Sequence, residues 1–369
     1  MKITCTKEQL HHAVQIVQKA VATKTPSPIL TGIFLCAEGN QLQLQATDYE
    51  IGIKCTIDAQ VEEPGSIVLS GRYFQEMVRR LPGDHIQIAT SQEDRTIKIT
   101  SNFAQFNLLS LPAEEFPVLK ALSDENVLTV KDNVLKDLIK KTVFACAADE
   151  ARPIFTGGLL EADTDGIRMV ATNTHRLALK RDNLDNNDKN IRMIIPSKIL
   201  SELARLLTSE IPVDVNIYWH RNQVAFEFEH VYIISRLIEG QFPDYNKVIP
   251  ASFATNITVK SSEFMDAVER VSLLARDSDY NVIKFSFKED SVTITSNNPD
   301  IGKATETVPS HMDGNELDIA FNAKYVADIL KNINSDKLVF SLNTPLSPAC
   351  IKPIDDQNYT YVITPVRTS

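Results

Sequence analysis

The residues whose chemistry is most evident are the lysines and arginines of six stretches in which apolar residues recur with helical spacing. Together these stretches hold 14 basic and 9 acidic residues, whereas the rest of the chain holds 24 basic and 39 acidic residues. Basic helix faces can bind a phosphate backbone without reading bases, although an ordinary solvated face explains any single stretch equally well. The stretches are residues 7–19, 72–80, 132–141, 197–205, 262–276 and 323–331.

If the basic faces of the six helical stretches lined one common space, that space would carry positive charge while the outside of the protein carried negative charge. The third stretch illustrates the pattern, because its lysines are expected to point away from the apolar face formed by Leu135, Leu138 and Ile139. The fifth stretch carries a net charge of −1 and is the exception. The cations that we expect to face phosphate are Lys24, Arg72, Arg79, Arg80, Lys136, Lys140, Lys141, Lys198 and Arg205.

Signatures of catalysis and of metal binding are missing from the sequence. It contains no GxGxxG, GxxxxGK or HExxH motif, and its seven histidines do not cluster with carboxylates. Asp163 and Asp165 are better explained as the tip of a hairpin than as a metal site. Five scattered cysteines without a CxxC pair are typical of reduced, buried thiols. We therefore expect no catalytic residue, no metal and no cofactor.

The composition is that of an ordinary soluble protein. A chain of 369 residues, 43% apolar and 23% charged, exceeds the usual size of one hydrophobic core, so two or three domains are expected. The net charge of −10 by itself argues against nucleic-acid binding, so any such binding must depend on where the charges lie. No run of 18 apolar residues is present and the first residues lack a signal-peptide core, which favours a cytoplasmic location.

Four landmarks recur with a period close to 125 residues. Residues 46–48 (Ala-Thr-Asp) reappear 125 residues later as 171–173 (Ala-Thr-Asn), and Phe116-Pro117 reappears 126 residues later as Phe242-Pro243. The segments that begin at Ile29 and at Arg72 recur in the same way. We therefore predict three copies of one domain, which span residues 1–121, 122–250 and 251–369.

Each copy combines two helical patterns with short alternating runs. In the first copy, Leu10, Ala13, Val14 and Val17 form one apolar helical stripe. The remaining runs alternate apolar and polar residues between Gly, Pro, Asn and Asp, a pattern typical of antiparallel strands. The predicted fold class is α+β, with two helices on the face of a mostly antiparallel sheet in each copy.

Seven strings, in this order and at this spacing, resemble the bacterial DNA polymerase sliding clamp family, the beta subunits of the replicative DNA polymerase III. The resemblance covers the whole chain. It implies a clamp fold that closes into a ring as a head-to-tail homodimer, with the six helical stretches of each subunit lining the hole. The strings are 27–30 (SPIL), 47–50 (TDYE), 111–117 (LPAEEFP), 170–178 (VATNTHRLA), 240–245 (GQFPDY), 296–299 (SNNP) and 361–367 (YVITPVR).

The function implied by this resemblance is that of a processivity factor in chromosomal replication, with no enzymatic activity. The ring would encircle duplex DNA without sequence specificity, and a clamp loader would open it. The replicative DNA polymerase and other proteins with a clamp-binding motif would tether to it.

The resemblance also implies a peptide-binding client pocket between the second and third domains. Apolar side chains would hold the Leu and Phe anchors of a peptide, and basic and hydroxyl groups would fix its backbone. Asn173-Thr174 stands where the family usually has Asp-Gly, Lys247 where Arg is common and Thr364 where Met is common. By matching strings, the pocket residues are Thr172, His175, Arg176, Leu177, Pro243, Lys247, Val248, Leu346, Val362, Pro365, Val366 and Arg367.

Two apolar segments are candidates for the subunit interface. The resemblance places Phe106 and Leu108 of one subunit against Leu273 and Leu274 of the other. From the sequence alone, a strand buried on both faces explains the first pair, and a tolerated surface leucine explains Leu273.

Two other functions stay open at this point. A monomeric, triplicated enzyme or nuclease accessory predicts one pocket with perturbed carboxylates and a dependence on metal. A peptide-binding scaffold that never touches DNA predicts no space lined by basic helices.

Overall fold

The computed structural model describes residues 1–90, 96–149, 151–184, 187–275 and 281–367, and the chain divides into two compact units. The N-terminal unit comprises residues 1–133 and 205–237, and the C-terminal unit comprises residues 134–204 and 238–369. The middle third of the chain is therefore shared between the units, because its strands extend the sheets of both. The domain boundaries at residues 121 and 250 stay a prediction.

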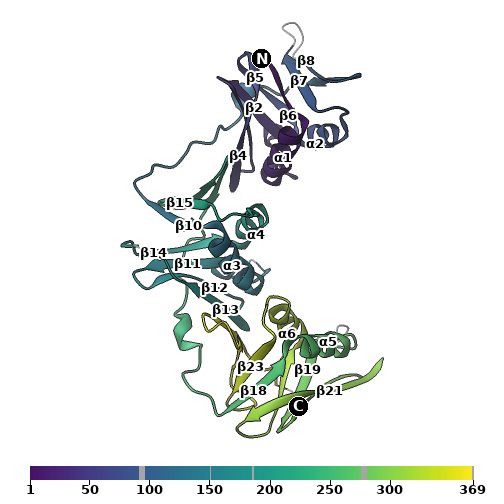
Figure 1. Ribbon diagram of the computed structural model, residues 1–369, viewed down its shortest axis with the longest axis vertical. Coiled ribbons are helices and arrows are strands. Elements are labelled where there is room, and N and C mark those ends of the chain that lie inside the picture. Colours follow the sequence, from purple (N-terminus) through teal and green to yellow (C-terminus); the bar gives the residue numbers. More distant parts are fainter. Residues whose placement is uncertain (91–95, 150, 185–186, 276–280, 368–369) are drawn as a thin grey trace. The chain divides into compact units, whose positions relative to one another are not determined.

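Two antiparallel sheets build the N-terminal unit (purple to teal in Figure 1). The larger has eight strands in the order β10-β15-β16-β17-β4-β3-β2-β6, and the smaller has five in the order β5-β1-β7-β8-β9. Helices α1 (Lys7–Val17) and α2 (Gly71–Arg80) pack on each other and on strands β2, β4 and β6. The strands are β1 (Lys2–Thr6), β2 (Gly32–Glu38), β3 (Gln41–Thr47), β4 (Ile51–Asp58), β5 (Gln60–Glu63), β6 (Gly65–Ser70), β7 (His85–Thr90), β8 (Thr96–Ser101), β9 (Ala104–Leu109), β10 (Val127–Lys131), β15 (Asp214–His220), β16 (Gln223–Phe228) and β17 (Val231–Arg236).

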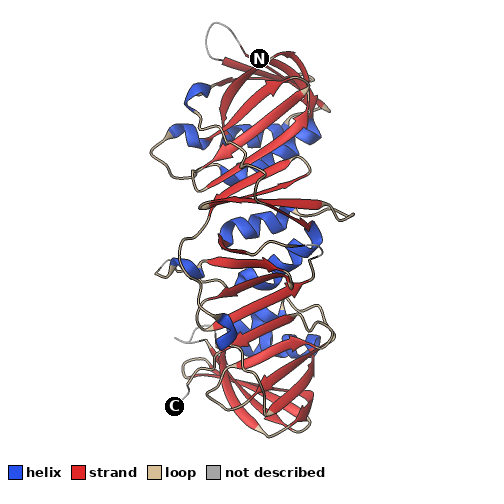
Figure 2. Cartoon of the chain, turned by 90° about the vertical axis from the view of Figure 1, so that its left-hand side faces the viewer, coloured by secondary structure: helices blue, strands red, loops and turns tan. Residues whose placement is uncertain are grey.

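A single antiparallel sheet of twelve strands runs through the C-terminal unit, in the order β14-β11-β12-β13-β25-β24-β23-β18-β21-β20-β19-β22. Helices α5 (Ser261–Ser272) and α6 (Ala323–Leu330) cover part of it (Figure 2), and α3 (Asp132–Thr142) and α4 (Ser197–Leu206) cross the boundaries between the units. The strands are β11 (Gly157–Asp163), β12 (Gly166–Thr172), β13 (Arg176–Asp182), β14 (Ile191–Pro196), β18 (Thr255–Lys260), β19 (Val282–Lys288), β20 (Ser291–Asn298), β21 (Gly302–Asp313), β22 (Leu317–Asn322), β23 (Lys337–Leu342), β24 (Ala349–Pro353) and β25 (Tyr359–Ile363).

Local sequence signals explain where the helices begin and which face they bury. The Thr6 hydroxyl accepts a hydrogen bond from the amide of Gln9 at 3.3 Å and caps α1. Asn322 caps α6 in the same way by accepting from the amide of Tyr325. The apolar stripe predicted for the first helix is the buried face of α1.

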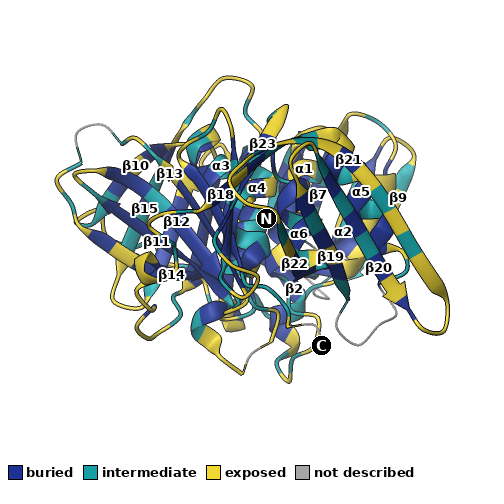
Figure 3. Ribbon diagram, turned by 90° about the horizontal axis from the view of Figure 1, so that it is seen from below, coloured by how far each residue is buried: buried dark blue, intermediate teal, exposed yellow. Residues whose placement is uncertain are grey.

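Aromatic rings dominate the core of the C-terminal unit. Phe264 of α5 lies edge-on to Phe340 of β23, with ring centroids 5.2 Å apart, and it stacks on Phe285 of β19. Buried residues, dark blue in Figure 3, fill strands β11 to β13 almost completely.

The prediction of an α+β fold with antiparallel sheets is confirmed. None of the described helices is long and apolar enough to cross a membrane.

Candidate functional site

The candidate site is built around the turn between β12 and β13. The Thr172 hydroxyl donates to the carbonyl of Arg176 at 2.6 Å and accepts from the amide of Thr174 at 3.1 Å. The side-chain oxygen of Asn173 accepts from the amides of His175 and Arg176, both at 3.1 Å. These bonds hold Thr174 at a φ of +77°, which is costly for a β-branched residue and explains why glycine suits this position.

The segment that follows Gly240, residues 242–248, forms the second wall of the site. The ring of Phe242 is buried and lies edge-on to Phe155, with centroids 6.0 Å apart. The Tyr245 hydroxyl donates to Oε2 of Glu161 at 2.7 Å, and burial together with that carboxylate raises the pKa of Tyr245. These contacts of Phe242 and Tyr245 hold the segment in place, and both side chains themselves line the cavity.

The end of the chain supplies the third wall. Strand β25 pairs with β13, and Val362 lies opposite Leu177 in the ladder. Beyond the strand, the amide and the hydroxyl of Thr364 both donate to the carbonyl of His175, at 2.9 and 2.8 Å. Residues far apart in the sequence are thus joined edge to edge by backbone hydrogen bonds.

These three walls enclose a cavity of about 200 Å³. Most of its lining is apolar, and the polar groups come from the turn and from Asp244, Tyr245 and Thr364. Such a cavity suits one or two apolar anchors of an extended peptide. It is lined by Phe155, Thr172, Thr174, His175, Arg176, Leu177, Phe242, Pro243, Asp244, Tyr245, Val248, Val362 and Thr364.

Arg176 is a rigid wall rather than a mobile cation at the rim. Its side chain is only 5% exposed, and its guanidinium donates to Asp328 and to the backbone carbonyl of Phe144. The same group lies 4.5 Å from the ring centroid of Tyr325 and 5.6 Å from that of Phe144. Both terminal nitrogens of Arg176 are thus paired inside the protein, whereas its buried Nε has no hydrogen-bond partner among the described residues. That Arg176 binds a peptide backbone stays a prediction.

Seven of the twelve predicted pocket residues line the cavity. The other five do not. Lys247 is exposed and lies 3.6 Å from Asp244, and Leu346 is exposed. The amide of Val366 donates to the carbonyl of Ala320, which holds the chain end outside the cavity. The five are Lys247, Leu346, Pro365, Val366 and Arg367.

The sequence argument missed Phe155, Phe242, Asp244 and Tyr245 as lining residues. A signal for two of them existed. Phe242 belongs to the repeated Phe-Pro pair, and Phe155 belongs to the segment that repeats Ile29–Gly32. Repetition marked these residues as landmarks of the fold, and their contact across the cavity follows only from the folded chain.

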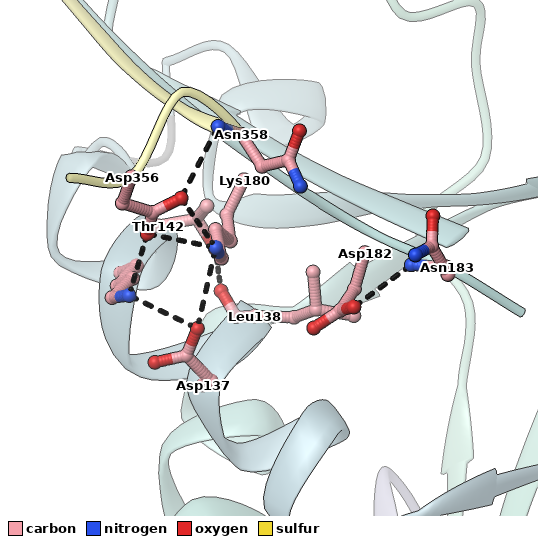
Figure 4. A network of polar contacts seen from close by, with 9 residues as sticks. Asp137, Leu138, Thr142, Lys180, Asp182, Asn183, Asp356 and Asn358 are labelled. Atoms are coloured by element: carbon pink, nitrogen blue, oxygen red, sulfur yellow. Dashed lines mark hydrogen bonds and ion pairs between the residues drawn. The ribbon is translucent and has the colours of Figure 1, made fainter. Parts of the chain in front are cut away.

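A cluster of charges lies beside the ladder between β13 and β25 (Figure 4). Nζ of Lys180, whose side chain is 8% exposed, lies 2.8 Å from Oδ2 of Asp356 and 3.7 Å from Asp137. Nζ of Lys141 contacts the same two carboxylates at 3.0 and 3.1 Å. Burial raises the pKa of Asp356, but the hydrogen bonds from Lys180 and Lys141 outweigh it, and the net pKa is lowered.

Lys141 accordingly differs from the expectation that it points to an open phosphate-binding face. Its side chain is 18% exposed, and its ammonium lies over the ring of Tyr359 as well as between two carboxylates. Burial lowers its pKa, but the two carboxylates more than compensate, so the net pKa of Lys141 is raised. We assign it to the packing of the C-terminal unit.

The other predicted phosphate contacts lie on or next to the helices. Lys24, Arg72, Lys140, Lys198 and Arg205 are exposed, and Lys136 is half-buried. Arg79 and Arg80 are also exposed, and both pair with Oε2 of Glu76, at 2.8 and 3.0 Å. Exposed pairs of this kind exchange easily for a phosphate.

Two of the predicted interface residues lie on an edge strand, and the other two directly follow a helix. Strand β9 is the outer strand of its sheet, where Phe106 is 43% exposed, Leu109 is 79% exposed and Leu108 is half-buried. The alternative of a strand buried on both faces is therefore wrong. Leu273, directly after α5, is exposed, and Leu274 is half-buried. Their pairing across a subunit boundary stays a prediction.

Asp163 and Asp165 occupy the tip of the hairpin between β11 and β12, as predicted. Oδ1 of Asp163 accepts from the amide of Asp165, and Oδ2 accepts from Arg168, which lowers the pKa of Asp163. Within the described part of the chain, no group of three or more His, Cys, Asp or Glu side chains could hold a metal ion.

Comparisons with known proteins cover the entire chain. Residues 1–120, 129–244 and 246–367 match the N-terminal, central and C-terminal domains of the DNA polymerase III beta subunit. The beta sliding clamps of Bacillus subtilis and Staphylococcus epidermidis are 37% and 35% identical, with 100% of both chains covered. The crystal structure of the DNA polymerase sliding clamp from Bacillus subtilis superposes with a TM-score of 0.95 at 36% identity and full coverage.

Proposed function

The chain belongs to the family of bacterial DNA polymerase III beta subunits, the sliding clamps, and from this premise we propose that it encircles duplex DNA as a processivity factor and tethers the replicative polymerase. The observation that carries the tethering role is the apolar cavity between the turn at Thr172, the segment 242–248 and strand β25. No chemical step is assigned to the chain, whose role is to bind and to hold.

The cavity would take the apolar anchors of a short peptide, a Gln followed by Leu and Phe. Short linear motifs bind in the micromolar range, which corresponds to about −8 kcal/mol. Arg176, fixed between Asp328 and two aromatic rings, keeps one wall in place before the peptide arrives. A preformed wall lowers the ordering cost of binding, so a small cavity can retain a large partner.

Two open strand edges support closure into a ring. Strand β9 presents one edge in the N-terminal unit. In the C-terminal unit, the first half of β21 pairs with β20 on one side, and its described neighbours leave the other side open. A head-to-tail homodimer that joins such edges buries both, together with Phe106, Leu108, Leu273 and Leu274.

The exposed helix cations would then contact the phosphates of the enclosed duplex. Because net charge −10 repels free DNA, direct binding is weak and strongly dependent on salt. A clamp loader that opens the ring supplies the route onto DNA, and the protein works in the cytoplasm, where the chromosome is copied. The proposed contacts are Lys24, Arg72, Arg79, Arg80, Lys136, Lys140, Lys198 and Arg205.

The experiment that tests this function is retention on DNA after loading. The protein loaded on a nicked circle should stay bound in salt that abolishes direct binding, and it should leave once the circle is linearised, because only a topological link depends on free ends. Phe106→Asp is the matched control, since a charge buried at the ring contact prevents closure. Equal loss from circular and linear DNA contradicts the ring and favours a peptide-binding scaffold.

A further inference from the structure

The turn at Thr47 repeats the turn at Thr172 atom for atom. The Thr47 hydroxyl donates to the carbonyl of Ile51 at 2.8 Å and accepts from the amide of Tyr49, which has a φ of +73°. The carboxylate of Asp48 accepts from the amides of Glu50 and Ile51, as Asn173 does 125 residues later. The N-terminal unit therefore contains the frame of a second groove.

The neighbouring elements are repeated as well. Gly52 pairs with Ile234 between β4 and β17, where Leu177 pairs with Val362 between β13 and β25. The segment 116–122 lies at the place of 242–248, and the amide of Arg236 donates to the carbonyl of Glu50 as Thr364 donates to His175. Residues of 47–52, 117–122 and 234–236 line a cavity of about 360 Å³.

The two grooves differ in what fills their apolar floor. Position 177 is a leucine whose side chain lines the open cavity, whereas the equivalent position 52 is a glycine. A Cβ atom placed on Gly52 would lie 2.5 Å from Cδ2 of Leu119 and 2.9 Å from Cγ2 of Ile234. The side chain of Leu119 therefore occupies the space directly above Gly52.

Leu119 is held in this position by its surroundings. Its amide donates to Oε1 of Gln45 at 3.0 Å, and the amide of Leu122 is bonded to the Tyr232 hydroxyl at 2.8 Å. Leu119 also packs against the cluster of Ala225, Tyr232 and Ile234. Its counterpart Tyr245 lines the C-terminal cavity, and its hydroxyl donates to Glu161.

The space that Leu119 leaves open is rimmed by charge. Glu50 and Arg236 lie 3.7 Å apart, and Lys120 is also exposed at the rim. An apolar anchor placed there would displace water from these groups without replacing its hydrogen bonds, which disfavours binding.

From this geometry we infer that Leu119 is a built-in plug that fills the anchor slot of the N-terminal groove, so that each chain offers one peptide site although it contains two grooves. The pair Gly52 and Leu119 is thus what determines which groove accepts a client. The inference rests on the proposed peptide-binding function of the C-terminal groove.

The test is the number of peptides bound per chain, measured by isothermal titration calorimetry with a peptide that contains Gln followed by Leu and Phe. The intact chain should bind one. The double variant Gly52→Leu, Leu119→Ala gives the N-terminal groove the leucine floor that the C-terminal groove has and removes the plug, while Ile234, whose Cγ2 would lie 2.9 Å from the new Cβ, has to shift. This variant should bind two peptides, the second within about tenfold of the first. Leu119→Ala alone should also reveal a second, weaker site.

Val118→Ala is the matched control, because it shortens the neighbouring side chain of the same segment, which is exposed, and it should leave one site. Binding at the C-terminal groove reports that the C-terminal unit is folded, and urea unfolding followed by circular dichroism reports in every variant that the N-terminal unit, which carries the substitutions, is folded as well. The plug is overturned if both Leu119→Ala and the double variant bind only one peptide per chain while binding at the C-terminal groove is intact. It is also overturned if the unchanged chain binds two peptides. Absence of binding in all proteins overturns the C-terminal groove itself and the inference with it.

Discussion

The turns at Thr47 and Thr172 share one backbone conformation and one set of hydrogen bonds, yet only the second opens onto an apolar cavity. The difference lies in side chains that exchange places. Leucine stands on the strand at 177 and on the linking segment at 119, while glycine and tyrosine take the complementary positions 52 and 245. A duplicated frame therefore fixes where a groove can form, and a few side chains decide whether its apolar floor is open.

The ladders behind the two turns differ in the same way. In the C-terminal unit, Lys180 pairs with Tyr359 in the ladder and is surrounded by Asp137 and Asp356. The equivalent pair in the N-terminal unit is Cys55 with Val231, both buried and apolar. Charge thus stabilises the ladder behind the C-terminal groove, and apolar packing stabilises the ladder behind the N-terminal groove.

The largest expected effect comes from Arg176, a wall of the C-terminal groove whose equivalent position in the N-terminal groove is Ile51. Arg176→Ala leaves Asp328 without its cation and removes the group between two rings, so unfolding in urea should show a loss of about 3 kcal/mol, and peptide binding should be lost. Ile51→Ala at the equivalent position should cost about 2 kcal/mol and leave peptide binding unchanged. Peptide binding that survives Arg176→Ala would contradict the role of this wall.

The sequence predicted the backbone segments that build the site better than the side chains that line its cavity. Residues 172–177 and Phe242-Pro243 stood out because they recur, and the α+β class followed from periodicity. The membership in the clamp family, which these strings predicted, is confirmed.

What escaped the sequence depended on contacts between distant segments. Nothing in the string around Arg176 indicates that Asp328 and Tyr325 would enclose its guanidinium. Lys141 follows the helical spacing of an exposed cation, but Asp356, 215 residues away, draws it into a cluster. The fit of Leu119 over Gly52 likewise joins two residues that no local pattern connects.

A second, smaller effect is expected from the charge cluster. Asp356→Asn should lower the stability of the C-terminal unit by about 2 kcal/mol at neutral pH, because Lys180 keeps only its longer contact to Asp137. The control Asp318→Asn, which breaks the exposed pair with Lys284, should cost less than about 1 kcal/mol. Equal losses in thermal unfolding of the two variants would contradict the distinction between the ladders.

The same cluster predicts a dependence on pH. The lowered pKa of Asp356 means that its carboxylate stabilises the fold at pH values above its usual pKa of 3.8. This contribution is lost as the pH falls below 3.8 and through the lowered value. The free energy of unfolding in urea should therefore fall more steeply for the intact chain than for Asp356→Asn as the pH is lowered from 5 to 2, roughly the range over which such carboxylates titrate. Parallel curves would show that the carboxylate contributes nothing.

The smallest expected effect concerns the two strained turn positions. Thr174→Gly relieves a β-branched residue at φ +77° and should raise stability by about 0.5 kcal/mol, after the greater freedom of glycine in the unfolded chain is subtracted. Tyr49→Gly at φ +73° should behave alike. Because Thr174 lines the C-terminal cavity, only Thr174→Gly should also change peptide affinity, which titration calorimetry of both variants would show.

The most direct test of the central claim, that the apolar floor is open in one groove and covered by Leu119 in its repeat, is a crystal structure of the unchanged chain with the Gln-Leu-Phe peptide. The account predicts that the Leu and Phe side chains of the peptide lie between Leu177, Pro243 and Val362. It also predicts that Leu119 keeps its place above Gly52, with no peptide in the N-terminal groove. A peptide seated over Gly52 with Leu119 displaced, or an empty C-terminal cavity at saturating peptide, would contradict the account.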